Sequence, residues 1–243
     1  MQILIYYSAV WLQAIKDVTA IRSGVLTIPM VACMVVGSIS AGATIQRTGW
    51  LNPFAIGGAC IAPIGAGLLC LLKPSSPQAQ FQVITIFGFG LGLCMQQGNM
   101  AIQAVLPVKD ISTGISFVMI GQTLGGAIWI AVAQSVLNNR IAKGLVGIPG
   151  LTNAAQIVTT GATDLRNLVA PQYLGPVLEA YNNALVSVFY VGMALCLGAI
   201  IGALGFEWKN LKTAKEEQAK AMKAATEAKK AAEARQEGEK QEV

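Results

Sequence analysis

Five stretches of this chain contain no Asp, Glu, Lys or Arg: residues 23–46, 48–72, 74–108, 111–139 and 180–206. Soluble domains are about 25% charged, so a run of this length arises by chance in roughly one case in a thousand. The hydrocarbon core of a bilayer is about 30 Å thick and needs about 20 helical residues, and a charge at its centre costs about 2.5–3.5 kcal/mol. The pattern therefore predicts an integral membrane protein.

These runs indicate helices rather than barrel strands, because they are rich in Gly and Ala and lack strict alternation. We expect an all-α membrane protein of six transmembrane helices with an added charged C-terminal helix. The spans fall near 1–15, 24–46, 52–72, 81–105, 113–137 and 183–206. The first span is short and starts at Met1, which suggests a helix whose first half is missing.

Two segments lie outside these spans. Residues 138–182 form the long connection, which begins as a loop and includes a short surface helix near 172–181. Residues 207–243 are rich in Ala, Glu, Lys and Gln and form a tail that is helical or disordered. The tail is interpreted as a solvated segment, with binding to anionic lipid or a partner protein as the alternative.

Charge and residue usage exclude several classes of function. The net charge is +5, but the basic residues are scattered on short loops or mixed with Glu in the tail, so no nucleic-acid partner is expected. The chain has no His, which removes most hydrolytic triads and catalytic metal sites. Its five Cys lie inside apolar runs without a CxxC pair and are interpreted as packing residues. We therefore predict no enzyme activity, no cofactor and no metal.

The distribution of Lys and Arg predicts the orientation. The side of the membrane that carries the tail holds Arg47, Lys109 and several tail lysines, whereas the other side holds Lys16, Arg22, Lys73 and the basic residues of the long connection. The slight excess on the tail side predicts a cytoplasmic C-terminus and an extracytoplasmic 138–182 loop.

The end of the second span carries a short loop pattern, Gly42-Ala-Thr-Ile-Gln46-Arg47-Thr-Gly49. Arg47 can bond helix-end carbonyls or a neighbouring carboxylate, and the alternative is an Arg that snorkels at the interface. The pattern resembles the loop signature of the major facilitator superfamily, Gly-x-x-x-Asp-Arg-x-Gly, but Gln46 replaces the Asp. A gating role for Gly42, Arg47 and Gly49 is what this resemblance implies.

Further segments resemble the C-terminal half of the fungal fourteen-span drug:proton antiporters of that superfamily: Gln103–Pro107, Gln122–Ala127, Gly161–Arg166 and Glu179–Asn182. The resemblance covers most of residues 1–210 and identifies the spans as the last six. It implies two inverted three-helix repeats, one half of a major facilitator fold, which works with a missing N-terminal half. It also implies efflux of drugs or toxins as small-molecule substrates across the plasma membrane, with the vacuolar membrane as the alternative.

Polar residues at membrane depth are the candidate site. Gln96, Asn99 and Gln103 share one face of the 81–105 span, and Gln122 and Trp129 share one face of the next. Such amides either line a cavity for amphipathic molecules or hold helices together by hydrogen bonds worth about 0.6–2 kcal/mol.

By the resemblance, Tyr6, Tyr7 and Trp11 in the first span also line the cavity, although an aromatic belt is an alternative for Trp11.

Glycines four residues apart predict close helix packing. The pairs are Gly88/Gly92, Gly121/Gly125 and Gly198/Gly202. A nucleotide-binding loop at Gly88-x-Gly90-x-Gly92 is rejected, because neither a preceding strand nor a following Lys-Ser/Thr is present.

No carboxylate lies inside a predicted span. Because a proton antiporter needs a titratable group, proton coupling either resides in the missing half or does not occur. We expect half of an efflux transporter that works by alternating access and that neither transports nor couples when expressed alone. The alternatives from other classes are a small oligomeric channel or scaffold and a membrane-embedded enzyme.

Overall fold

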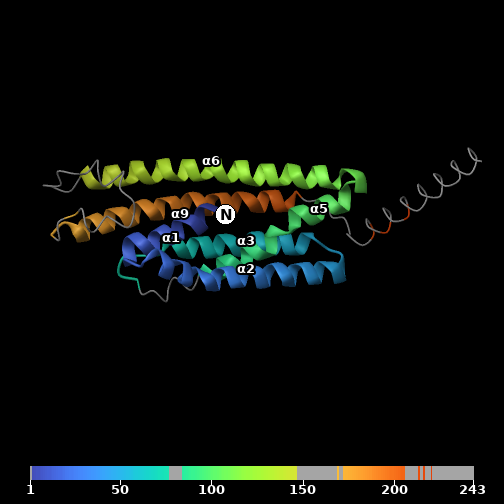
Figure 1. Ribbon diagram of the computed structural model, residues 1–243, viewed down its shortest axis with the longest axis horizontal. Helices are drawn as coiled ribbons and strands as arrows, with labels where there is room; N and C mark the ends of the chain where they lie inside the picture. Colours follow the sequence, from blue (N-terminus) through green and yellow to red (C-terminus); the bar gives the residue numbers. More distant parts are fainter. Residues whose placement is uncertain are drawn as a thin grey trace, which may run out of the picture.

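The computed structural model describes residues 2–76, 84–146, 169, 172–205, 213, 216 and 220, without the side chains of residues 104 and 108. Every regular element in this part of the chain is a helix (Figure 1). The elements are α1 (Gln2–Lys16), α2 (Ala20–Thr48), α3 (Asn52–Cys70), α4 (Ile84–Met95), α5 (Gln97–Val105), the 3-10 turn η2 (Val108–Asp110), α6 (Ile111–Val146) and α9 (Leu174–Leu204). The all-α prediction is confirmed for these residues.

Four of these helices, α2, α3, α6 and α9, are long and apolar enough to cross a membrane. At about 1.5 Å per residue, α1 with its 15 residues reaches about 22 Å, which is shorter than a hydrocarbon core of about 30 Å. The predicted 81–105 span is divided into α4 with 12 residues and α5 with 9. The six-span layout and its inverted repeats therefore stay predictions.

A side-chain hydrogen bond accompanies the division between α4 and α5. Gln97 is buried, and its Nε2 donates a 2.8 Å hydrogen bond to the carbonyl oxygen of Leu93. In an uninterrupted helix the backbone N–H of residue 97 would bond to that carbonyl. A side-chain amide that competes for a backbone acceptor favours an interruption, and Gln96 forms the turn between the two helices.

The helices α6 and α9 are longer than predicted, which corrects the proposed 138–182 loop. Residues 138–146 continue α6 and residues 174–182 belong to α9, so neither is loop and no separate surface helix begins near 172. The charge of Arg140 ends an apolar run but not a helix. Leu137, Ile141 and Leu145 continue a buried stripe at four-residue spacing. Residues 147–168 of the connection lie outside the described residues.

The tail prediction is hardly addressed by the structure. Within residues 207–243, only Thr213, Glu216 and Lys220 are described, and these three are helical and exposed.

Glycines bring α4 close to both α2 and α3. A Cβ added at Gly88 would collide with the carbonyl oxygen of Met30, and one added at Gly92 with that of Met34, both on α2. On the other face of α4, a Cβ at Gly90 would lie 2.7 Å from the backbone nitrogen of Ala62 on α3. Only a residue without a side chain allows such backbone approach. The α2–α4–α3 arrangement is therefore the most tightly specified part of the bundle.

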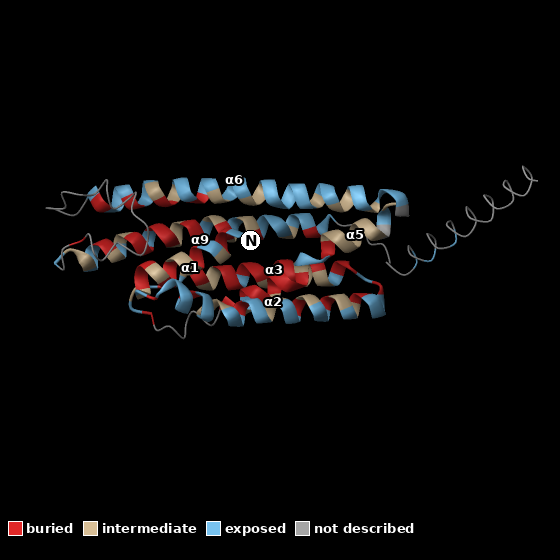
Figure 2. Cartoon of the chain, viewed as in Figure 1, coloured by how far each residue is buried: buried red, intermediate tan, exposed pale blue. Residues whose placement is uncertain are grey.

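Two helices leave broad apolar faces uncovered. In the most apolar 18-residue segment of α6 no residue is buried, and in that of α2 only 17% of the residues are buried. Figure 2 shows α6 as largely exposed along its length, in contrast to the buried residues of α3. Exposed apolar faces of this size mark surfaces that contact lipid or another protein.

Candidate functional site

A cavity of about 420 Å³ lies between α6, the α4–α5 junction, the start of α1 and α9. The largest wall comes from α6, whose lining residues follow at i, i+1, i+4, i+5 and i+8 and so share one helix face. The lining comprises Gln2, Ile3, Cys94, Met95, Gly98, Gly121, Gln122, Gly125, Gly126, Trp129 and Leu195. Its volume is typical of a small-molecule site, and its surface is mostly apolar with a few polar groups.

The structure places both predicted α6 residues, Gln122 and Trp129, in the wall of this cavity. The predicted packing pair Gly121 and Gly125 also lies in the wall. A Cβ added at either glycine would have no neighbour within 4 Å in the described part of the chain. These two glycines therefore widen the cavity instead of contacting another described helix.

The other two glycine pairs differ from each other. Gly88 and Gly92 approach the backbone of α2 closely, whereas added Cβ atoms at Gly198 and Gly202 on α9 would meet none of the described atoms within 4 Å. The predicted close packing at Gly198 and Gly202 therefore has no partner among the described residues.

The predicted amides of the 81–105 span do not line this cavity. Gln96 is exposed in the turn between α4 and α5, and Gln103 is half-buried on α5. Asn99 is also half-buried, and its Oδ1 is buried without a hydrogen-bond partner among the described atoms. The choice between lining and helix–helix contact stays open for these three residues.

The two tyrosines of α1 have different surroundings. Tyr6 is 54% exposed, whereas Tyr7 is 1% exposed and donates a 2.8 Å hydrogen bond from its hydroxyl to Gln134 Oε1 on α6. Their rings meet edge to face with centroids 5.0 Å apart. Neither tyrosine lines the 420 Å³ cavity. The hydrogen bond from Tyr7 instead joins α1 to α6.

Trp11 is fully buried and links three helices. Its Nε1 donates a 2.8 Å hydrogen bond to Asn182 Oδ1 on α9, and Asn182 Nδ2 donates at 3.2 Å to the carbonyl oxygen of Leu72, which follows α3. Lys16 Nζ lies 5.7 Å from the Trp11 ring and donates to the carbonyl oxygens of Pro74 and Ser76. Trp11 therefore acts in the core and does not line this cavity.

Replacing Trp11 with Phe is expected to destabilise the protein by about 1–3 kcal/mol, because Asn182 keeps its buried oxygen without the indole donor. The matched control is Trp129→Phe, since Trp129 is 41% exposed. Thermal unfolding of the purified chain in detergent measures both effects. Equal melting temperatures for the two variants would show that the Trp11–Asn182 hydrogen bond contributes nothing.

The predicted loop signature lies at the end of α2. Gly49 ends this helix with φ 82°, a left-handed conformation that favours glycine, and its N–H bonds to the carbonyl oxygen of Ile45. Arg47 is exposed in the last turn, where a positive charge interacts favourably with the helix dipole. Gly42 faces Met100 of α5, because an added Cβ would lie 3.7 Å from the Met100 methyl group. The gating role of Gly42, Arg47 and Gly49 stays a prediction.

Sequence reasoning missed the contribution of the α4–α5 junction to the cavity. Cys94, Met95 and Gly98 line it, and the turn at Gln96 lies between them. The sequence Gln96-Gln97-Gly98, two polar amides and a glycine inside an apolar run, is the signal that could have identified this interruption.

The cavity contains no carboxylate, and the described residues contain no cluster of three or more His, Cys, Asp or Glu side chains that could hold a metal ion. Two amides, one indole and apolar walls can hold a mostly apolar molecule and offer it a few hydrogen bonds.

No protein-family model matches the chain. Among curated proteins, it is similar to the MFS-type transporter VdtG of Byssochlamys spectabilis, with 43% identity over 213 residues, 86% of this chain and 38% of that protein. The MFS-type efflux pump MFS1 of Arthroderma benhamiae is 40% identical over 223 residues, 90% of this chain and 41% of the pump. The rubrofusarin-specific efflux pump aurT of Gibberella zeae is 37% identical over 206 residues, 84% of this chain and 37% of the pump. The chain thus spans about two fifths of the length of the curated relatives it matches.

Proposed function

We propose that this chain, which is similar to fungal MFS-type transporters and efflux pumps, forms the C-terminal half of a transporter that exports drugs, toxins or other small amphipathic molecules by alternating access. The observation that carries the proposal is the similarity of 86–90% of this chain to named transporters and efflux pumps. The presence of four apolar helices of membrane-spanning length supports it. The transporter lies in the plasma or vacuolar membrane with its C-terminus in the cytoplasm.

In this proposal, α1 and the α4–α5 pair complete a six-span half made of two inverted three-helix repeats. Interrupted helices line the central sites of many transporters, where the freed backbone groups face a cavity. The α4–α5 junction supports this interpretation, because Met95 and Gly98 on either side of it both line the 420 Å³ cavity.

The 420 Å³ cavity is the part of this half that faces substrate. Gln122 offers hydrogen bonds and Trp129 offers an apolar surface with one N–H donor. One relative carries a substrate in its name, rubrofusarin, which supports a small organic molecule as cargo. The lining of this cavity has no carboxylate. We therefore assign proton coupling to the N-terminal half of the transporter.

A chimera tests this function. The chain replaces the matching segment of VdtG, and export of a panel of amphipathic dyes is measured in a host without its own efflux pumps. We expect export above the empty-vector control, with unmodified VdtG as the positive control. A chimera that reaches the membrane in normal amount but exports none of the dyes that VdtG exports would contradict the proposal.

A further inference from the structure

A second hollow lies between α6 and α9, away from the 420 Å³ cavity. It consists of two cavities of about 520 and 470 Å³, which both include Arg140, Lys143 and Ser187 in their linings and therefore form one groove. The two helices approach closely at the 470 Å³ cavity, where an added Cβ on Gly144 would lie 3.0 Å from Ala180 Cβ.

The groove crosses the boundary between apolar and charged sequence. Arg140 is the first charge after the run 111–139 on α6, and Glu179 is the last charge before the run 180–206 on α9. Since the two helices are antiparallel (Figure 1), both charges mark the same edge of the apolar layer. Val136 and Val191 line the groove on the apolar side of that edge.

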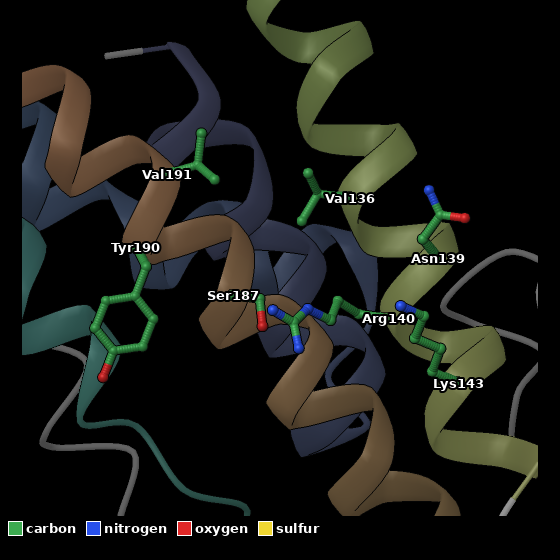
Figure 3. A pocket seen from close by; sticks show the side chains of 7 residues that line it. All are labelled: Val136, Asn139, Arg140, Lys143, Ser187, Tyr190 and Val191. Carbon is green, nitrogen blue, oxygen red and sulfur yellow. The ribbon is translucent and has the colours of Figure 1, made fainter.

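Two cations face this boundary from one helix. Arg140 and Lys143 are three residues apart, so they share a face of α6. Helical side chains lean toward the N-terminus of their helix, which for α6 is the apolar side of the edge. Figure 3 shows the Arg140 side chain extending from α6 toward α9, where Ser187 lies. Glu179 of α9 also lines the 470 Å³ cavity, so the three charged side chains of the groove sum to one positive charge.

We propose that this groove binds one glycerophospholipid, with its phosphate at Arg140 and Lys143 and an acyl chain along Val136 and Val191. Arg and Lys form strong charge-assisted hydrogen bonds with phosphate oxygens. Tyrosine is enriched at the interface between membrane and water, where the phosphate of a lipid also lies. Tyr190 lines the 520 Å³ cavity, and 53% of its surface is exposed. A small soluble anion would leave the apolar half of the groove unused. The proposal requires α6 and α9 to cross a membrane but does not depend on transport.

Native mass spectrometry of the full chain in nonionic detergent tests this site. The probes are phosphatidylglycerol and diacylglycerol with the same acyl chains, which differ in the phosphate-bearing headgroup. We expect one phosphatidylglycerol to bind at least about tenfold more tightly than diacylglycerol. The double variant R140Q/K143Q loses this preference, whereas K73Q/K109Q, with the same loss of charge on exposed residues outside the groove, keeps it.

A second variant covers the case in which R140Q/K143Q does not fold. Val136→Trp keeps both cations but fills the apolar side of the groove, so we expect it to weaken lipid binding. We expect inorganic phosphate to leave lipid binding unchanged, both in the unmodified chain and in V136W. Equal affinity for the two lipids would overturn the proposal, as would equal binding by the two double variants. Competition by inorganic phosphate with unchanged binding in V136W would identify a small-anion site instead.

Discussion

Replacing Gly92 with Val lowers the stability of the protein more than replacing Trp11 with Phe does. The new Cβ would collide with the carbonyl oxygen of Met34 and lie 2.9 Å from the backbone nitrogen of Ser38. Overpacking a core typically costs about 1–3 kcal/mol. Both clashing atoms are backbone atoms that no rotamer change can move, so we expect the upper end of that range or more, measured by thermal unfolding in detergent.

The same substitution on α9 provides the matched control. An added Cβ at Gly202 has no described atom within 4 Å, so Gly202→Val leaves the melting temperature nearly unchanged. If Gly92→Val and Gly202→Val melt together, then α4 does not pack against α2 as described here.

Replacing Gly125 with Trp in the VdtG chimera abolishes most export without unfolding the protein. Gly125 lies in the wall of the 420 Å³ cavity, and an added Cβ there meets no described atom within 4 Å. The indole therefore projects into space that the proposal assigns to substrate. A clash of about 1–3 kcal/mol corresponds to a loss of about fivefold to about 140-fold in rate, since about 1.4 kcal/mol is a factor of ten.

Gly198→Trp in the same chimera is the control, because Gly198 also has open surroundings but lies outside the cavity. Export of the dye panel is compared at equal amounts of membrane-inserted protein. Equal export by the Gly125 and Gly198 variants would mean that the 420 Å³ cavity lies off the transport path.

Composition predicted the helices that are long and apolar enough to cross a membrane. The charge-free runs predicted α2, α3, α6 and α9 because exclusion of charge is a property of the membrane and needs no knowledge of packing. The predicted span 113–137 is shorter than α6 because the loss of apolar character at Arg140 does not end a helix whose buried stripe, Leu137–Ile141–Leu145, continues.

The roles of side chains whose partners lie far away along the chain were harder to predict from the sequence. The environment of Tyr7 is decided by Gln134, and that of Trp11 by Asn182, both far away along the chain. The interruption at Gln96 is accompanied by one side-chain bond, from Gln97 to the carbonyl oxygen of Leu93. That Gln122 and Trp129 line the same cavity could be predicted, because their seven-residue spacing puts them on one face of a single helix.

The central claim is that this chain supplies one half of an efflux transporter. Dye export compared between the VdtG chimera and the 243-residue chain alone, at equal amounts in the membrane, tests it most directly. The account predicts export by the chimera and none above background by the chain alone. Export by the chain alone at the rate of the chimera, or none by a correctly inserted chimera, would contradict it.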